Sequence, residues 1–518
     1  MGQESLQILI VMVVYMAAVI GIGIFFARRA NADTEKFFLG GRSLGPWVSA
    51  MSAEASDMSG WLLMGLPGVA YWCGLADAFW TAAGLAVGTY INWLVVSKRL
   101  RRYSIAANNS ITLPEFFSNR FHEKKKVIMG ISAAFILVFF TVYAASCLVT
   151  CGKLFSTLFG APYIIMMLVG AAFVLIYTLL GGFLAESASD FMQAIVMVVV
   201  LVAVLTLGVA NAGGLGAVFE NVKDFPGFLE FFGIADPVTE GGVQLAVNGV
   251  PSFGARQDYG ALNVASMLAW GLGYFGMPQV LLRFMAIRRE DELKRARRVA
   301  MVWVVISLTA AIMIGIVGRA LFPTALTTAS EAENVFVYLS RLLLPAALAG
   351  LAMAGILAAT ISSSDSYLLI AASAFAKNAY QGIFKKNATD KEVMTLSRIM
   401  LPVITAIAIV IALDENSVIF TIVSFAWAGF GATFGPLVLF SLFWKRMTRA
   451  GAIAGMLSGG GMVFIWKLVI KPLGGIFGIY ELLPAFIVSG IFIIVVSLLT
   501  NAPSKEIQDE FERVKKGA

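Results

Sequence analysis

Apolar runs of about 20 residues recur along the whole chain, and short polar segments separate them. A run of this length crosses a bilayer as one helix, since a helix rises about 1.5 Å per residue and the apolar core is about 30 Å thick. The pattern predicts an all-α polytopic membrane protein with about 13 transmembrane helices. The predicted spans are 6–27, 44–72, 77–96, 127–158, 162–180, 187–210, 262–285, 299–321, 343–374, 397–413, 418–443, 450–469 and 483–500.

Composition supports this class and excludes a soluble protein. The 518 residues are 59% hydrophobic and 13% charged, with a mean hydropathy of +0.85. Soluble globular domains have about twice that share of charged residues. We expect a single membrane domain over residues 1–518, whose longest segment outside the bilayer is an extracellular loop at 211–261.

Basic residues are distributed unevenly between alternate loops. With the N-terminus outside, 31 of the 38 Lys and Arg residues fall on the inner side, seven of them in segment 283–298. Cytoplasmic loops are rich in these residues, so we expect a multi-pass protein of the plasma (inner) membrane with a cytoplasmic C-terminus. The net charge of +7 is then explained by the excess of Lys and Arg on the inner side of the membrane. The expected partners are membrane lipid and a small-molecule substrate, with no nucleic acid and no obligate protein partner.

Two predicted spans carry residues that do not suit a plain lipid-facing helix. The second contains Glu54 and Asp57, followed by glycines and a proline. A carboxylate at the bilayer centre costs about 2.5 kcal/mol or more, so it needs a partner or a function. The seventh has three glycines between Trp270 and Pro278. We expect both helices to be interrupted in mid-membrane, freeing backbone carbonyls for a cation; the alternative is that Gly and Pro are simply common in membrane helices.

The two interrupted spans each begin a set of five. Because five is odd, the two sets must cross the membrane in opposite directions, which predicts a five-plus-five inverted repeat with its binding site between the interrupted helices. The expected parts are an extra N-terminal helix (1–43), a first repeat (44–210), the extracellular loop (211–261), an inverted second repeat (262–444), two extra helices (445–500) and a cytoplasmic tail (501–518).

The ninth span holds a second polar cluster, with four serines and an aspartate at 362–366. Ser362, Asp365 and Ser366 share one helical face at spacing i, i+3, i+4. Their hard oxygens suit Na⁺, Mg²⁺ or Ca²⁺. The alternative is that the serines only bond the carbonyl one turn back.

Two other segments carry polar or amphipathic signals. At the inner end of the sixth span, Glu186 is predicted to be solvated at the interface, and Asp190, one turn deeper, to face the bundle interior. In the tail, Ile507, Phe511 and Val514 share one face, which predicts a short amphipathic helix docked on the surface.

Several stretches together resemble the solute:sodium symporter family, and within it the branch that transports proline. The set is specific and extends over nearly all of the chain. The resemblance implies a leucine-transporter-like fold with a five-plus-five inverted repeat and Na⁺-coupled symport. The matching stretches are 37–42, 53–61, 181–190, 268–276, 283–285, 443–446 and 451–452.

By position, the resemblance implies a main Na⁺ site between the second and ninth spans. Its ligands would be the carbonyls of Ala55, Met58 and Ala359 and the hydroxyls of Ser362 and Ser363. Asp57 would be a required acid on the cation pathway. Some relatives hold a second, deeper Na⁺, which here would use Asp190, Ser362, Asp365 and Ser366. Asp365 stands where the proline branch has a serine, so one or two Na⁺ per cycle stay open as alternatives.

The resemblance also implies substrate contacts around the interrupted helices. Aromatic rings beside free helix ends can enclose an apolar ring and leave backbone groups for a carboxylate and an ammonium. Ordinary helix packing is the alternative for each aromatic. Met277 stands where the proline branch has a glutamine, and such an interior change alters specificity. The implied contacts are Ser59, Gly60, Trp61, Tyr143, Trp270, Tyr274 and Pro278.

These signals together predict a secondary transporter that imports L-proline with Na⁺ by alternating access. Another amino acid, a monocarboxylate or a vitamin is the alternative substrate. We expect neither an enzyme nor an organic cofactor, and there is no GxxxxGK[ST] motif for ATP. A transporter-like sensor is disfavoured because the tail is too short for a signalling domain, and a channel because no filter motif is visible.

Overall fold

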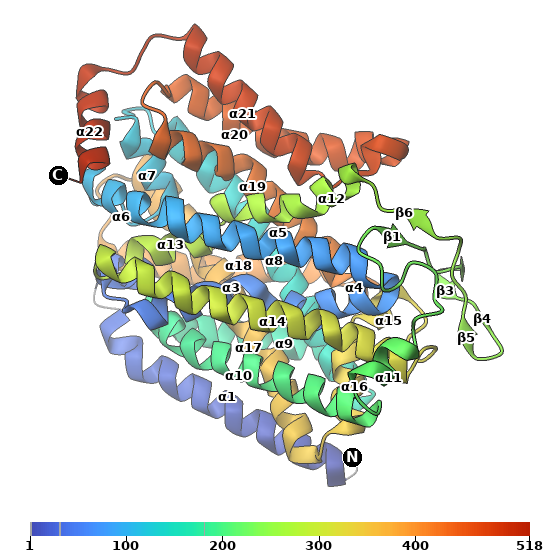
Figure 1. Ribbon diagram of the computed structural model, residues 1–518. Coiled ribbons are helices and arrows are strands. Elements are labelled where there is room, and N and C mark those ends of the chain that lie inside the picture. Colours follow the sequence, from blue (N-terminus) through green and yellow to red (C-terminus); the bar gives the residue numbers. More distant parts are fainter. Residues whose placement is uncertain (1–2, 31–32, 181, 518) are drawn as a thin grey trace.

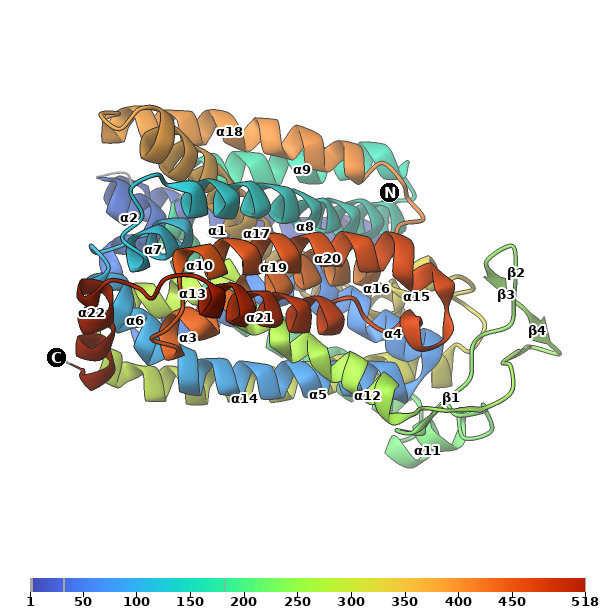
Figure 2. The ribbon, with the colours of Figure 1, turned by 90° about the horizontal axis from the view of Figure 1, so that it is seen from above.

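The computed structural model describes residues 3–30, 33–180 and 182–517, so Gly181 of the motif at 181–190 lies outside the described residues. Most of the chain forms long helices that run roughly side by side (Figures 1 and 2). Within the described residues, ten helices are long and apolar enough to cross a membrane. The predicted spans 44–72 and 262–285 are interrupted helices and 162–180 is a shorter apolar helix, so thirteen spans are compatible with the structure.

The first half of the chain begins with one peripheral helix and continues into the first interrupted helix. Its helices are α1 (Gln3–Ala30), α2 (Thr34–Leu39), α3 (Pro46–Gly60), α4 (Leu66–Cys73), α5 (Leu75–Ile91), α6 (Ser97–Ala106), α7 (Leu113–Arg120), α8 (Val127–Phe159), α9 (Tyr163–Leu180), α10 (Phe183–Asn211) and α11 (Leu215–Glu220).

The second half begins with the other interrupted helix. Its helices are α12 (Ala261–Leu268), α13 (Pro278–Ala286), α14 (Leu293–Leu321), α15 (Ala329–Ala332), α16 (Val335–Leu343), α17 (Ala346–Ser373), α18 (Asp390–Ile411), α19 (Ile419–Phe443), α20 (Arg449–Ile465), α21 (Leu482–Leu499) and α22 (Lys505–Lys516).

The two interrupted helices run in opposite directions. In Figure 1, α3 to α4 runs from the end of the bundle nearer the C-terminus toward the end that carries the strands, and α12 to α13 runs back. A π-helical turn, Trp61–Gly65, separates α3 from α4, and a 3₁₀ segment, Ala269–Phe275, separates α12 from α13. Both predicted interruptions are therefore confirmed. The opposite directions are those of an inverted repeat.

Glycines allow the second interruption to lie directly against α5. Gly84 and Gly88 are one helical turn apart, and a Cβ at either would overlap the backbone of Leu268 or Gly271. Small residues at this spacing let helix backbones approach closely within a membrane. The 3₁₀ segment is thus held at the centre of the bundle.

The loop between α10 and α12 carries short strands that the all-α prediction did not include. They form three two-stranded antiparallel pairs: β1 (Gly233–Ile234) with β6 (Gln257–Asp258), β2 (Thr239–Glu240) with β3 (Val243–Gln244), and β4 (Ala246–Val247) with β5 (Val250–Pro251). This loop projects beyond one end of the helices (Figure 2). It is far from the central residues described below.

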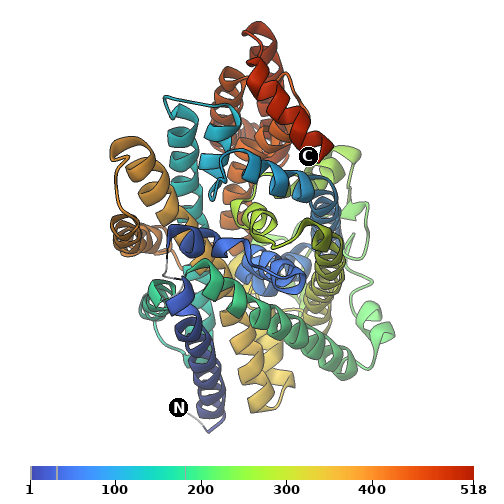
Figure 3. The ribbon, with the colours of Figure 1, turned by 90° about the vertical axis from the view of Figure 1, so that its left-hand side faces the viewer.

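The last described helix, α22, lies across one end of the bundle (Figure 1). Ile507, Phe511 and Val514 of α22 are buried, and the Arg99 guanidinium lies 4.9 Å from the centre of the Phe511 ring. The predicted amphipathic docking helix is therefore confirmed. Seen along the bundle, the N-terminal helix and the C-terminal helices occupy opposite edges and leave α3 in the interior (Figure 3).

A buried ion pair joins elements at the opposite end of the bundle. Lys153 Nζ of α8 lies 2.7 Å from Glu333 Oε2, which follows α15. The Glu333 carboxylate also accepts the backbone N–H groups of Ile419 and Phe420 at 2.9 Å, where α19 begins. A carboxylate at a helix N-terminus satisfies amides that have no partner within the helix, so Glu333 fixes α19 to α8.

Candidate cation and substrate site

The first interruption is centred on Ser59. Its backbone has φ 50° and ψ −167°, outside the helical region. Positive φ is uncommon for a residue other than glycine and is maintained only when surrounding contacts hold it. Because the chain leaves the helix at Ser59, the backbone groups that follow it do not continue the geometry of α3.

The carbonyl of Ala55, one turn before this break, meets the serines of α17. Ser362 Oγ donates to Ala55 O at 2.9 Å and lies 3.2 Å from Ala359 O, while Ser363 Oγ lies 3.3 Å from Ala55 O. All four residues are buried. The structure thus brings together four of the five predicted Na⁺ ligands, and we call Ala55, Ala359, Ser362 and Ser363 the oxygen cluster.

Met58 is the predicted ligand that these contacts do not include. Its carbonyl accepts the backbone N–H of Trp61, which caps the end of α3. Ser364 is also outside the cluster, because its hydroxyl bonds Thr360 O one turn back at 2.6 Å. The simple alternative for membrane serines therefore holds for Ser364, whereas Ser362 and Ser363 reach across to the other helix.

Asp57 joins the two interrupted helices. It is buried, and its Oδ2 accepts the hydroxyl of Tyr274 at 2.7 Å, while Gln279 Nε2 lies 3.5 Å from Oδ1. Tyr274 belongs to the 3₁₀ segment and Gln279 to α13. The Asp57 carboxylate is therefore directed to the second repeat, as expected for an acid that is not a direct ligand of Na⁺. Gln279 is a site residue that the sequence analysis missed.

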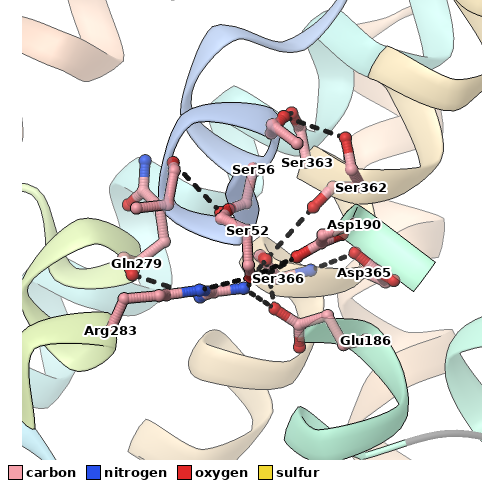
Figure 4. Close-up of polar contacts among 12 residues, drawn as sticks. Ser52, Ser56, Glu186, Asp190, Gln279, Arg283, Ser362, Ser363, Asp365 and Ser366 are labelled. Atoms are coloured by element: carbon pink, nitrogen blue, oxygen red, sulfur yellow. Dashed lines mark hydrogen bonds and ion pairs between the residues drawn. The ribbon is translucent and has the colours of Figure 1, made fainter. Parts of the chain in front are cut away.

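Arg283, which falls in the predicted span 262–285 and was counted with the basic residues of the inner side, lies inside the protein. Its side chain is fully buried. The guanidinium pairs with Glu186, lies 3.2 Å from Asp190 Oδ2, and donates to Ser52 and Ser366 at 3.0 Å (Figure 4). The positive-inside count did not reveal this network, because it considers the side of the membrane and not the burial of a cation.

The prediction that Glu186 is solvated was wrong. Glu186 is only 4% exposed and accepts from both Arg283 and Ser366. Asp190 faces the interior as predicted, is buried, and accepts the Ser52 hydroxyl at 2.6 Å. A buried carboxylate requires such partners, because its desolvation cost is otherwise several kcal/mol.

The residues predicted for a second Na⁺ site are divided between two environments. Asp190 and Ser366 are bound to Arg283. Asp365 accepts the Ser366 backbone N–H at 2.7 Å, but its Oδ2 has no partner among the described residues, and neither has Glu186 Oε2. Both side chains line a cavity of about 10 Å³, near the smallest volume that holds one water.

Three of the predicted aromatic residues, Trp61, Trp270 and Tyr274, form a buried wall beside the Ser59 break. The ring centres of Trp61 and Trp270 are 5.5 Å apart, and each lies within 6 Å of Phe420, at 5.8 and 5.1 Å. Tyr274 packs edge to face on Trp427 at 5.0 Å. Such pairs stabilise packing beyond their buried area. The sequence analysis missed Phe420 and Trp427, which come from α19.

The other predicted substrate residues also lie at the breaks. Tyr143 of α8 places its hydroxyl 3.4 Å from Asp57 O. Ser59 Oγ accepts the Trp61 N–H at 3.2 Å. A Cβ on Gly60 would lie 2.5 Å from the Thr150 hydroxyl, so glycine is required there. Pro278 is the first residue of α13, where its fixed φ suits a helix start.

One polar atom in the aromatic wall is unpaired. The indole N–H of Trp61 is buried and has no hydrogen-bond partner among the described residues. Buried donors nearly always have a partner, and leaving one unpaired costs about 1–3 kcal/mol. This donor, beside the backbone break, suits an acceptor group on a ligand.

Comparison with known proteins identifies the family. A model of the sodium:solute symporter family matches residues 37–459. The chain belongs to this family. Curated members are similar over nearly the whole length. A sodium/proline symporter of Haemophilus influenzae is 42% identical, covering 98% of this chain and 97% of the relative. A high-affinity proline transporter of Bacillus subtilis, PutP, is 40% identical, covering 94% and 97%.

Solved structures of transporters share the fold of this symporter. A Na⁺-coupled sialic acid symporter in a substrate-bound, outward-open state superposes with a TM-score of 0.76 at 17% identity, covering 96% of this chain and 99% of the other. The transporter MhsT in complex with L-phenylalanine superposes with a TM-score of 0.51 at 16% identity, covering 87% and 97%. The predicted all-α, leucine-transporter-like fold is therefore confirmed, and the protein is a multi-pass membrane symporter.

Proposed function

We propose that this symporter imports L-proline together with Na⁺ across the plasma membrane by alternating access. One observation carries the proposal: the break at Ser59 places the oxygen cluster and the aromatic wall on the two sides of a single turn of backbone. Na⁺ on one side and the substrate on the other would then contact the same short backbone segment. The full-length relatives named for proline support the choice of substrate.

Na⁺ is proposed to bind at the oxygen cluster. Carbonyls of unwound helices are the usual ligands of coupling ions in transporters of this architecture. In the structure, the hydroxyls of Ser362 and Ser363 face Ala55 O, and each hydroxyl oxygen retains lone pairs for an ion. An ion there would bind α3 to α17 and hold the Ser59 segment in place, completing the substrate pocket.

L-Proline is proposed to bind at the aromatic wall, with its apolar ring against Trp61, Tyr143 and Trp270. The unpaired indole N–H of Trp61 and the start of the helical segment that follows Ser59 would bind the carboxylate, since the start of a helix attracts negative charge. We propose that the substrate is transported without chemical change and that no organic cofactor takes part.

The energetics allow strong accumulation with one ion. Moving one positive charge through about 100 mV supplies about 2.3 kcal/mol, and a tenfold Na⁺ gradient supplies about 1.4 kcal/mol more. One Na⁺ per neutral amino acid therefore supports an accumulation of several hundredfold. The proposed orientation, N-terminus outside and C-terminus in the cytoplasm, fits termini at opposite ends of the bundle (Figure 1).

Uptake of labelled L-proline into proteoliposomes tests this function. Uptake is measured with an inward Na⁺ gradient, with K⁺ or Li⁺ in place of Na⁺, and with an inward proton gradient alone. We expect uptake above the equilibrium level only with a Na⁺ gradient, and competition by unlabelled proline. Stronger competition by another amino acid, a monocarboxylate or a vitamin would replace proline as the substrate, and uptake independent of Na⁺ would overturn the proposal.

A further inference from the structure

An apolar groove runs along the outer surface of α3, the helix that contributes Ala55 to the oxygen cluster. It has a volume of about 410 Å³ and lies between α3, α10 and α14. Its walls include Trp47 and Met51 of α3, Val198 of α10 and Val302 of α14, and almost all of its surface is apolar. The volume is within the range of small-molecule sites.

The groove has the direction and length of part of an acyl chain. On α14 it extends from Arg298 to Ile306, roughly 12 Å of helix. Because α14 and the other wall, α10, are membrane-spanning helices, the groove runs across the bilayer leaflet. Trp47 is 53% exposed at one end, as is common for tryptophan at a membrane interface.

Two arginines stand at the polar end of the groove. Arg298 lines it, and Arg295 is one turn nearer the inner end of α14, on the same helical face. Both are exposed, and neither has an ion pair or hydrogen bond within the described chain. The nearby acids are already paired, Glu292 with Arg288 and Asp291 with Arg289. The two guanidiniums are therefore available to an external anion.

We propose that the groove binds one anionic phospholipid, with an acyl chain along α10 and α14 and the phosphate on Arg295 and Arg298. Arginine binds phosphate oxygens through paired N–H groups, and an apolar channel below it suits a lipid better than a free anion. Met51 neighbours Ser52, which bonds Asp190. The lipid would therefore contact the first half of α3, beside the residue that bonds Asp190.

Native mass spectrometry of the purified full-length protein tests the site, without reference to proline or Na⁺. The probes are phosphatidylglycerol and phosphatidylcholine with identical acyl chains. We expect the wild type to retain one phosphatidylglycerol in preference to phosphatidylcholine. The double variant Arg295→Gln/Arg298→Gln should bind it about 25-fold more weakly, since each basic residue near a membrane surface contributes about fivefold.

Two further variants separate a site from general surface charge. Arg297→Gln removes one arginine charge from the opposite face of α14, where the Arg297 guanidinium lies 5.3 Å from the centre of the Tyr90 ring; binding should be unchanged. Val302→Trp fills the groove and keeps both arginines; binding should be lost. Equal retention of both lipids by the wild type, equal losses in Arg297→Gln and the double variant, or full retention by Val302→Trp would each overturn the proposal.

Discussion

Ser362 is the side chain that links the two helices of the oxygen cluster. It touches Ala55 on the interrupted helix and Ala359 on its own helix. Ser364, two residues further along the same helix, is equally buried, but its hydroxyl bonds only within that helix. The pair therefore provides a matched comparison of a proposed ligand with a structural serine.

Ser362→Ala should raise the Na⁺ concentration for half-maximal proline uptake by about 10- to 100-fold. The reason is that a bond to a charged group contributes about 1.5–3 kcal/mol. Initial rates over a Na⁺ series measure it, and Ser364→Ala should give the wild-type value. Equal Na⁺ dependence in the two variants would remove Ser362 from the site.

Asp57→Asn tests the acid that joins the two repeats. Asparagine keeps the size of the side chain and can still accept from Tyr274, but the negative charge is gone. We expect a Na⁺ requirement raised at least about tenfold, because a nearby carboxylate attracts the cation through a medium of low dielectric constant. The same Na⁺ series measures it. Unchanged Na⁺ dependence would show that Asp57 serves packing alone.

The interrupted helices show what local sequence can and cannot predict. Glycine, proline and carboxylates in mid-membrane predicted both interruptions. The sequence did not place the first one at Ser59, because a serine has no tendency to break a helix. One turn before this break, the Ala55 carbonyl contacts hydroxyls from α17, about 300 residues away in the chain, and no local rule contains that contact.

The network around Arg283 was missed for a related reason. Arg283 and Glu186 are 97 positions apart, and each was assigned by a rule that considers only its own segment. The positive-inside rule counted Arg283 only as an inner-side cation, and the usual solvation of acids placed Glu186 at the interface. A polar residue near the end of a span can equally face the bundle interior.

Arg283→Gln should lower the free energy of unfolding by about 3–5 kcal/mol, because it leaves buried carboxylates without their cation. The midpoint of thermal unfolding in detergent measures the loss. Arg288→Gln is the control, since its ion pair with Glu292 is 56% exposed on the arginine side and such pairs contribute about 1 kcal/mol or less. Equal midpoints for the two variants would contradict a structural role for the Arg283 network.

At the scale of the whole molecule, we expect the cation and substrate sites to be coupled through the Ser59 turn. Coupling between two sites is reciprocal in equilibrium binding: if Na⁺ raises the affinity for proline by some factor, proline raises the affinity for Na⁺ by the same factor. This relation applies without any membrane gradient. It therefore tests the site itself, separately from transport.

The most direct measurement is equilibrium binding of L-proline to the purified symporter in detergent, at zero and at saturating Na⁺. The account predicts an affinity at least about tenfold higher with Na⁺, within the usual range of such couplings, and a much smaller gain in Ser362→Ala. Proline binding of equal strength with and without Na⁺ would contradict it.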